Sequence, residues 1–291
     1  MDELELANRF DGRRPQLKAV AYRILGSVSE AEDAVQETWL RLQRTDAVRI
    51  ESLDSWLTTV TARICLNMLR SRRTRGEQPL EGLRPEPIID DPAARADPEH
   101  EAMLADSIGI ALQVVLDTLS PAERLAFVLH DMFAVPFAEI ARMLERSPQA
   151  TRRLASRARQ RVREAAPAPD PDLTRQRAVV DAYFAAARDG DLEALTAVLD
   201  PDVVLRSHRR DGEPRLLHGA AQVSRGAMSA RQFAPYVRPA LVNGAAGVVA
   251  FDGAHPFAVL AFTVVGDRVK AIDVFNDPEL VAKLDIGGIT A

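Results

Sequence analysis

Small and apolar residues recur at helical spacing in the first 75 residues of the chain. In "EAEDAVQETWLRLQR" they fall on one side of a helix, at Ala31, Ala34, Val35, Thr38 and Leu42. The opposite side is polar and carries Asp33, Gln36 and Glu37. Ser29 and Glu32 form a capping-box pattern that predicts the start of this helix. A second helix is predicted through "SWLTTVTARICLNMLRSRR", where an apolar residue recurs every four positions.

The periodic pattern stops at residue 76 and returns after about residue 107. Glycine, proline and acidic residues fill the interval, which predicts a linker over 76–107. Ser120, Pro121 and Glu123 then predict a capped helix start. "FAEIARML", "ERS" and "PQATRRLASRARQRV" follow as helix, short turn and helix. The segment 108–165 is therefore predicted to be a helix-turn-helix domain.

A second linker, "APAPDPD", covers residues 166–172, and the pattern changes after it. Residues 173–199 predict one or two helices. Short runs rich in valine, alanine and leucine with turn signals then predict five strands: "DVVLRS", "VRPALVNG", "GVVAFDG", "FAVLAFTVVGD" and "RVKAIDVFN". The helical piece "AAQVSRGAMSARQF" interrupts them. Residues 173–291 are therefore predicted to form an α+β domain with a core of its own.

Composition narrows the class of protein. Among 291 residues, 47% are hydrophobic and 27% charged, which is typical of globular proteins, and no apolar run is long enough to cross a membrane. The N-terminus "MDELELANRF" has no signal-peptide pattern, so we expect a cytoplasmic protein. One cysteine, Cys65, and five scattered histidines give no disulfide framework and no metal-ligand spacing. We expect no metal and no cofactor.

Charge is unevenly distributed although the formal net charge is only −5. Residues 63–75 hold five arginines and no acid, and residues 142–163 hold eight arginines and one acid. The connector between them, 77–106, has nine acids and two arginines. Two basic segments that flank an acidic one indicate two surfaces for a polyanion, held apart by a segment that a polyanion repels.

The second helix of the helix-turn-helix has two distinct faces. The predicted outer face carries Gln149, Arg152, Arg153, Ser156, Gln160 and Arg163, and the inner face Thr151, Leu154, Ala155, Ala158 and Val162. This pattern predicts a helix that enters the major groove of DNA, although a solvated basic helix shares the composition. We expect Gln149, Arg152, Arg153 and Ser156 to read bases, and Arg157, Arg159 and Arg161 to hold phosphates.

Two blocks of the chain resemble the extracytoplasmic-function (ECF) sigma factors of RNA polymerase. "AYRILGSVSEAEDAVQETWLRLQR" with "SWLTTVTARICLNMLRSRRTR" resembles their region two, and 111–163 resembles their region four. The resemblance implies that region two spans 1–75, the acidic linker 76–107 and region four 108–165. It implies that Asp33, Gln36 and Glu37 bind the beta-prime clamp helices of core RNA polymerase. It also implies −10 DNA contacts by Arg63, Asn67, Arg70, Arg72 and Arg73, and −35 contacts by Gln149, Arg152, Arg153, Ser156 and Arg157.

The third domain, 173–291, resembles the SnoaL-like cone domains, and the whole chain resembles the SigJ-like group of ECF sigma factors that carry this extension. The resemblance thus implies a fold class of two all-α sigma domains followed by an α+β SnoaL-like domain. Motifs of that group appear in altered form as "LRPEP", "RDGEPR" and "NDPEL". The resemblance implies contacts between domains that regulate the sigma factor in cis, at Pro85, Glu86, Pro87, Asp211, Arg215, Asp277 and Pro278.

Other functions stay open at this point. Asp273 lies in an apolar row of its strand, where burial would raise its pKa and suit it to act as a general base. Tyr183, His208, His218 and Asn276 are candidates to line the same cavity, and pairing of Asp273 with an arginine is the alternative. Rival functions are a ligand-sensing repressor and a SnoaL-type isomerase or hydrolase fused to DNA-binding domains. We expect a non-enzymatic sigma factor; a small-molecule ligand in the cone and the absence of a separate anti-sigma factor are both compatible with it.

Overall fold

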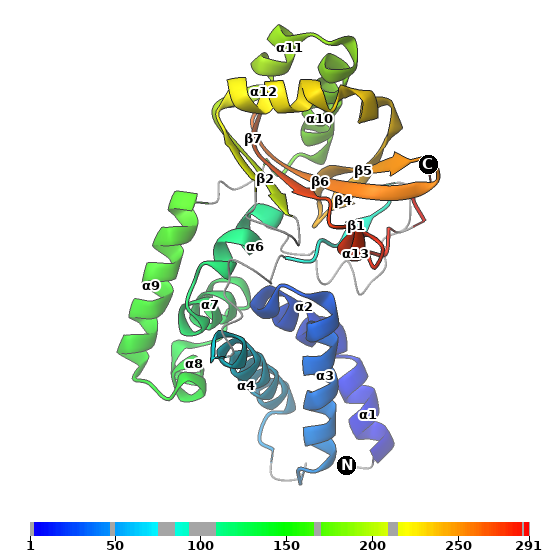
Figure 1. Cartoon of the computed structure of the whole chain (residues 1–291). Coiled ribbons are helices and arrows are strands. Elements are labelled where there is room, and N and C mark those ends of the chain that lie inside the picture. Colours follow the sequence, from blue (N-terminus) through cyan, green and yellow to red (C-terminus); the bar gives the residue numbers. More distant parts are fainter. Residues whose placement is uncertain are drawn as a thin grey trace. The chain divides into compact units, whose positions relative to one another are not determined.

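The structure, a computed structural model, describes residues 3–46, 50–74, 85–92, 109–165, 170–208, 215–286 and 288–290 (Figure 1). The chain divides into two compact units. A helical unit comprises Met1–Glu86, Asp97–Asp106 and Gln113–Ala165, and a C-terminal unit comprises Pro87–Ala96, Ser107–Leu112 and Ala166–Ala291. Among the described residues, no helix has the length and apolar character needed to cross a membrane.

Four helices form the first part of the helical unit: α1 (Glu3–Asp11), α2 (Arg14–Leu25), α3 (Val28–Gln43) and α4 (Leu53–Thr74). The predicted inner side of α3 is buried, and Val35 and Leu42 pack with Phe10, Leu17 and Leu57 in one apolar cluster. Thr38, the polar member of that side, donates to the Ala34 carbonyl and bonds the Thr61 hydroxyl of α4. The hydroxyl is therefore satisfied within the core.

The start of α3 differs from the sequence prediction. The N-cap is Ser27, whose Oγ accepts from the backbone N–H of Glu30 at 3.4 Å, and Ser29 already lies inside the helix. Both serines have a glutamate three residues later, so the capping-box pattern alone could not choose between them. The chain turn at Gly26, which has φ of 80°, ends α2 and fixes Ser27 as the cap.

The second part of the helical unit follows the connector. It contains α6 (Ile110–Asp117), α7 (Pro121–Phe127), the π-helical turn η2 (Val128–Met132), α8 (Phe137–Leu144) and α9 (Pro148–Ala165). The first three residues of α6 belong to the C-terminal unit. The predicted capping box is present: Ser120 Oγ accepts from Glu123 N–H and the Glu123 carboxylate accepts from Ser120 N–H. Ser147 Oγ likewise accepts from Ala150 N–H at the start of α9. The helix-turn-helix prediction is confirmed.

The C-terminal unit is a curved mixed sheet with its longer helices on one side. Its helical elements are α10 (Leu173–Asp189), α11 (Leu192–Ala197), α12 (Ala220–Ser229), the 3-10 turn η3 (Arg231–Tyr236) and α13 (Pro278–Val281). Its strands are β1 (Ile89–Asp90), β2 (Leu199–His208), β3 (Arg215–His218), β4 (Val237–Val242), β5 (Ala245–Asp252), β6 (His255–Val265) and β7 (Arg268–Phe275). The sheet order is β1-β4-β5-β6-β7-β2-β3, and among the strands that the structure describes only the neighbours β2 and β7 run parallel. The α+β domain predicted from the sequence is confirmed.

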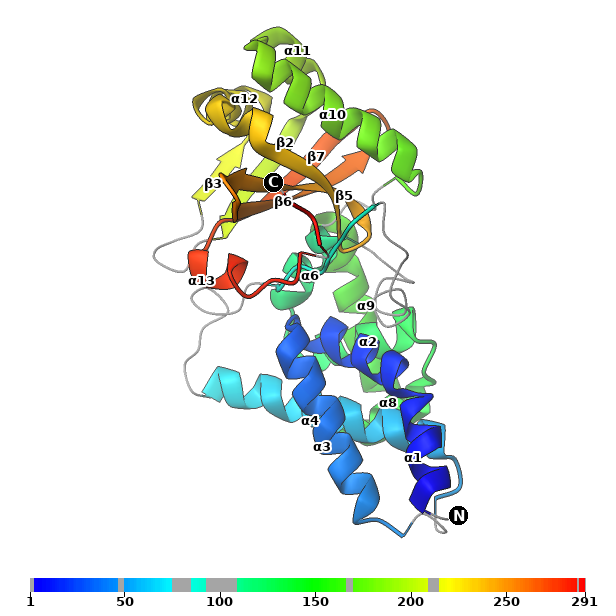
Figure 2. The same ribbon diagram turned by 90° about the vertical axis from the view of Figure 1, so that its right-hand side faces the viewer.

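The two faces of the sheet bury different sets of residues. The helices α10, α11 and α12 cover one face (Figure 2). Tyr183, Phe184 and Phe262 pack edge to face in the core between them and the sheet. The opposite face lies against α13 and the C-terminal tail, and its core includes Phe275 and Ile289. Ile89 of the connector and Ile110, the first residue of α6, belong to that second core. The predicted strands are all present, but β1 and β3 were not predicted.

Candidate nucleic-acid and polymerase interfaces

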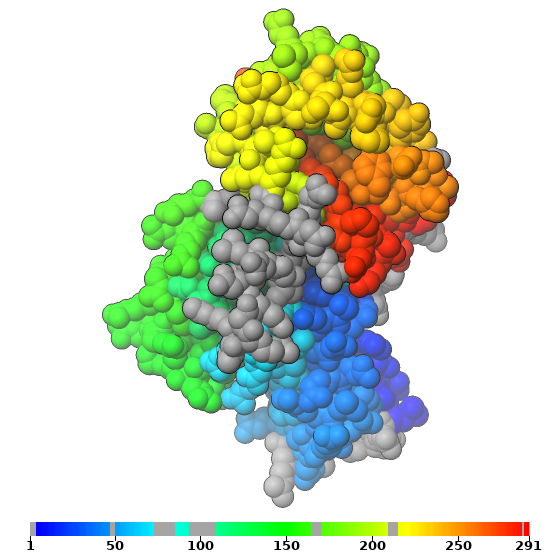
Figure 3. Space-filling view, viewed as in Figure 1, coloured from blue at the N-terminus to red at the C-terminus, as the bar shows by residue number. Residues whose placement is uncertain are grey.

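The predicted outer face of α9 is exposed. Gln149, Arg152, Arg153, Ser156, Gln160 and Arg163 all have exposed side chains. In the space-filling view, α9 lies along the left-hand side, in green (Figure 3). On the opposite side, Leu154, Ala155 and Ala158 are buried, as are Ile140 and Leu144 of the preceding helix. Burial of this apolar stripe fixes the rotation of α9 about its axis, so its polar face is available for a polyanion.

Three further arginines of α9 are tied to acidic residues. Arg157 and Arg161 donate to the Glu123 carboxylate at 3.0 and 3.3 Å, and Arg159 donates to Asp131 at 2.8 Å. Burial alone would raise the pKa of Glu123, but hydrogen bonds from Ser120 and Arg157 and the charge of Arg161 outweigh it and lower that pKa. Arg157 and Arg161 therefore help to dock α9 on α7 while their side chains stay more than half exposed.

The acidic side of α3 also faces outward. Asp33 and Gln36 are exposed, and Glu37 is half-buried beside Arg41, whose Nε donates to it at 2.8 Å. Leu40, 38% exposed, continues the same side. An acidic surface with one apolar residue suits a basic protein partner and is repelled by DNA.

The five residues predicted to contact −10 DNA do not share one environment. Arg63, Asn67 and Arg70 are exposed on α4, and Arg63 donates to the Arg142 carbonyl at 3.3 Å. The Arg73 side chain lies outside the described residues. Arg72 is 6% exposed, forms an ion pair with Glu30 and donates to the Leu25 carbonyl. The prediction that Arg72 contacts DNA is wrong for this structure, because its guanidinium is enclosed by protein acceptors.

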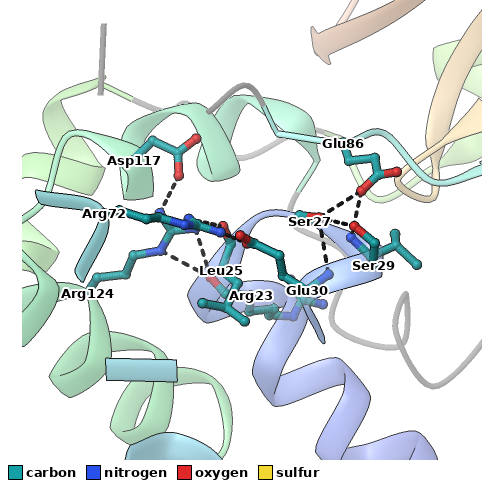
Figure 4. A network of polar contacts seen from close by, with 10 residues as sticks. Arg23, Leu25, Ser27, Ser29, Glu30, Arg72, Glu86, Asp117 and Arg124 are labelled. Atoms are coloured by element: carbon teal, nitrogen blue, oxygen red, sulfur yellow. Dashed lines mark hydrogen bonds and ion pairs between the residues drawn. The ribbon is translucent and has the colours of Figure 1, made fainter. Parts of the chain in front are cut away.

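Arg72 belongs to a polar network that joins the two parts of the helical unit (Figure 4). Arg124 of α7 pairs with Asp117 and donates to the carbonyl of Arg23 at the end of α2. The Arg124 side chain is 4% exposed. Each guanidinium satisfies backbone carbonyls that a helix end leaves without a partner. No periodic pattern in the sequence marks this network.

The connector enters the helical unit at Glu86. Its carboxylate accepts from Ser27 Oγ at 3.0 Å and from the Val28 N–H at 2.8 Å (Figure 4). Its backbone N–H donates to the Gly26 carbonyl, and its carbonyl accepts from the Tyr22 hydroxyl. Glu86 therefore places a negative charge at the N-terminus of α3, which is the stabilising end of the helix dipole for an anion.

Two residues further on, the connector is part of the C-terminal unit. Ile89 and Asp90 form β1, which pairs antiparallel with β4. Ile88 donates its N–H to the side-chain oxygen of Asn243 at 2.9 Å, and Asn243 N–H returns a bond to the Ile88 carbonyl at 2.8 Å. Asn243 has φ of 50° in the turn before β5, where asparagine is tolerated better than most residues. Pro85 and Pro87 flank Glu86 and are buried.

The other predicted regulatory residues belong to the C-terminal unit. Asp211 falls outside the described residues, and Arg215 is the exposed first residue of β3. Asp277 is the N-cap of α13: its carboxylate accepts from the backbone N–H groups of Glu279 and Leu280, with Pro278 at the first helical position. These contacts account for the "NDPEL" motif as a helix start.

The cluster around Asp273 is closed by its own ion pairs. Arg206 donates to both carboxylate oxygens, at 2.7 and 3.0 Å, and His208 Nε2 lies 3.0 Å from one of them. Burial would raise the pKa of Asp273, but hydrogen bonds and charges from His208 and Arg206 outweigh it and lower that pKa. Pairing with an arginine, the alternative left open above, is therefore the correct interpretation. A carboxylate with a lowered pKa is a poor general base near neutral pH.

The other residues considered for that cavity are separated from Asp273. Asp273 shares its face of β7 with Phe275, in the core under α13. Tyr183 is buried in the core of the opposite face, where burial raises the pKa of its hydroxyl. His218 is exposed on β3, and Asn276 bonds Ser207. These candidates therefore do not share one cavity: His208 contacts Asp273, whereas Tyr183 of α10 lies in the core of the opposite face.

Comparison with known proteins identifies the family of this chain. Family models of Sigma-70 region 2 and Sigma-70 region 4 match residues 10–75 and 110–162. The ECF RNA polymerase sigma factor SigJ of Mycobacterium tuberculosis is 39% identical, over 96% of this chain and 90% of its own length. The chain belongs to the ECF sigma factors. A probable ECF sigma factor SigI of the same species is 31% identical over 94% of this chain and 95% of its own length. The crystal structure of M. tuberculosis SigJ matches with a TM-score of 0.79 and 34% identity, covering 96% of this chain and 99% of that one.

As a sigma factor, the protein binds core RNA polymerase and promoter DNA and directs transcription initiation. The likeness to SigJ extends through the C-terminal domain, since it covers almost the entire length of both chains. The sequence alone did not reveal the Arg124 network, the Asn243 contact with Ile88 or the docking role of Arg157 in this sigma factor. Each of these contacts joins residues that are distant in sequence, so no local spacing pattern predicts it.

Proposed function

We propose that this sigma factor is regulated in cis by its C-terminal domain, which acts through the connector between regions two and four. The observation that carries the proposal is the double attachment of that connector. Glu86 caps α3 in the helical unit, while Ile88, Ile89 and Ile110 are built into the C-terminal unit.

If residues 87–112, which include the end of the connector and the start of α6, were unattached, they would form a flexible chain. Its root-mean-square span would be roughly 30 Å, with a broad distribution. Pairing of β1 with β4 and burial of Ile110 remove that freedom, since both ends of the segment join one core. The C-terminal domain thereby controls the spacing available to regions two and four when they engage the −10 and −35 elements together.

We assign the binding roles as follows. Asp33, Gln36 and Glu37 bind the beta-prime clamp helices of the polymerase. The −10 DNA is contacted by Arg63, Asn67, Arg70 and Arg73. The −35 element is read by Gln149, Arg152, Arg153 and Ser156, with Arg157 near the DNA backbone. The exposure of the α9 face and the outward acidic face of α3 support this assignment. Arg152→Ala and Arg153→Ala should each cost about 1–3 kcal/mol of discrimination at single −35 base pairs. Arg161→Ala should weaken binding to all DNA sequences alike.

We further propose that the C-terminal domain regulates without catalysing a reaction. Its buried carboxylate, Asp273, is saturated by Arg206 and His208 and has a lowered pKa, which opposes proton abstraction. A general base in an apolar cone would show the reverse shift.

The test loosens the connector without removing the domain. Deleting everything after Asp172 would strip the cover from Ile89 and Ile110, so a point substitution is cleaner. Asn243→Gly keeps the backbone at φ 50° and removes the oxygen that accepts from Ile88. Asn243→Asp keeps that oxygen and is the matched control. Combining Asn243→Gly with Ile89→Ser also removes a buried apolar side chain.

Transcription from one cognate promoter is compared at equal occupancy of core polymerase. We expect altered output from the loosened variants, unchanged core affinity, and near wild-type output from Asn243→Asp. Hydrogen exchange at Ile88–Asp90 verifies that the connector has been released. Released connectors with wild-type output would rule out regulation in cis and leave the sigma assignment intact.

A further inference from the structure

The Phe137 ring, at the first position of α8, is stacked against a histidine. The imidazole of His130 lies with its centroid 3.7 Å from that of Phe137, and the two planes differ by 31°. His130 belongs to the π-helical turn η2, and Phe137 begins the first helix of the helix-turn-helix. The stack therefore spans the connection between these two elements.

The histidine is itself held in place. Its Nδ1 lies 3.1 Å from the Val135 carbonyl oxygen. Because a carbonyl oxygen can only accept a hydrogen bond, we assign the imidazole proton to Nδ1, which donates it. Val135 N–H in turn donates to the Leu129 carbonyl at 2.8 Å, and Ala134 takes a left-handed φ of 54° to close the turn. The imidazole is thus a fixed support for one face of the Phe137 ring.

A cation of the recognition helix lies over the same ring. The guanidinium carbon of Arg152 is 5.7 Å from the Phe137 centroid, within the range of a cation–π contact. The same ring thus contacts both the imidazole of His130, at 3.7 Å between centroids, and the guanidinium of Arg152. Arg152 is exposed on the outer face of α9, so the ring contact restrains a long side chain that solvent would otherwise leave free.

We propose that Phe137 is a positioning residue for −35 recognition, holding the Arg152 guanidinium ready for a guanine. The inference rests on the proposed role of Arg152 as a base reader. A guanidinium reads O6 and N7 of guanine with two parallel hydrogen bonds, and this fork tolerates little angular error. A ring that stacks on the guanidinium plane leaves its N–H edge free for the base, so restraint and readout are compatible.

The expected effect is modest and specific to one base pair. An exposed cation–π contact of this kind corresponds to a loss of about two- to fivefold when the ring is removed. That loss should appear as reduced preference for guanine at the single −35 position that Arg152→Ala relaxes, and not as weaker binding to every sequence.

The experiment uses the full chain bound to core polymerase. Preferred −35 sequences are first selected with the wild-type holoenzyme, and each position is then varied singly in a binding competition. Phe137→Leu and Phe137→Met remove the ring while keeping an apolar side chain, and Phe137→Tyr retains the ring. Phe133→Leu, the same change in the same connection, is the matched control. A double-mutant cycle pairs Phe137→Leu with Arg152→Ala.

Support requires that Phe137→Leu and Phe137→Met relax the position read by Arg152, that Phe137→Tyr restores it, and that Phe137→Leu adds nothing once Arg152 is alanine. A uniform loss over all −35 positions, or an equal effect of Phe133→Leu, would overturn the proposal, because either result describes packing alone. Thermal unfolding identifies a variant that fails to fold, and Phe137→Tyr alone then decides: full guanine preference supports the proposal, and loss of it with an intact fold overturns it.

The Arg152→Ala result separates this inference from the proposed function. If Arg152→Ala itself relaxes no position, the proposed role of Arg152 fails and this inference fails with it. If Arg152→Ala relaxes one position and the Phe137 variants do not, only this inference fails.

Discussion

Removing the Glu86 carboxylate tests whether the connector stabilises the polymerase-facing helix. Glu86→Ala deletes an acceptor for two donors at the start of α3, Ser27 Oγ and Val28 N–H. Loss of a helix cap costs about 0.5–2 kcal/mol, and the ionised acceptor at the positive end of the helix dipole puts this site in the upper half of that range. We expect about 1–2 kcal/mol, localised to the first turn of α3. Glu86→Gln keeps one acceptor oxygen and should cost less than about 1 kcal/mol.

Hydrogen exchange measures this directly. A local loss of 1–2 kcal/mol corresponds to amide exchange roughly 5–30 times faster in the first turn of α3, with little change in α4. Glu37→Ala is the matched control, because it removes a glutamate from the same helix at an exposed i,i+4 pair worth only about 0.3–0.5 kcal/mol. Equal exchange at the start of α3 in wild-type protein and Glu86→Ala would refute the capping role and weaken the mechanism proposed for the connector.

Two further predictions concern the outer face of α3 and the buried cluster of the sheet. Reversal of Asp33 and Glu37 to lysine should lower core polymerase affinity by more than about 100-fold at low salt, with unchanged thermal unfolding. The reason is that like charges would then meet across the interface. Normal affinity of this variant would exclude this face of α3 as the polymerase-binding surface. Asp273→Asn should destabilise the C-terminal domain by about 3–5 kcal/mol in denaturant unfolding, because it leaves Arg206 without its charge partner. The folded pKa of Asp273 is lowered, so its stabilising effect is present above the ordinary aspartate pKa and disappears as pH falls through the lowered value. A stability gain in Asp273→Asn would instead indicate a functional carboxylate.

Much of the fold could be predicted from local patterns in the sequence. The two faces of α9 follow from its residue spacing, because a helix surface is determined by periodicity and one apolar stripe. The box at Ser120 and Glu123 was predictable for the same reason, since all its atoms lie within one turn. At Ser27 and Ser29 the same pattern occurs twice, and the choice depends on where α2 ends.

Contacts between distant segments escaped prediction. Arg72 and Arg70 are two residues apart in one basic run, yet one is enclosed by Glu30 and Leu25 and the other is exposed. β1 consists of two residues in an acidic, proline-containing segment, and it is a strand only because β4 offers an edge. Asp273 could be placed on an apolar row, but its partners lie on β2, and only the register of β2 against β7 brings Arg206 beside it.

The pairing of Ile88 with Asn243 joins positions 155 residues apart, and this separation has a consequence during synthesis. A ribosome adds about 5–20 residues per second, so roughly 10–30 s pass between the emergence of Ile88 and that of its partner. Regions two and four are complete in the nascent chain before that time, while the edge that receives β1 does not yet exist. Closure of this long loop is therefore the last step in assembling the connector, and a chain on the ribosome passes through an interval in which both DNA-binding regions are present and untethered.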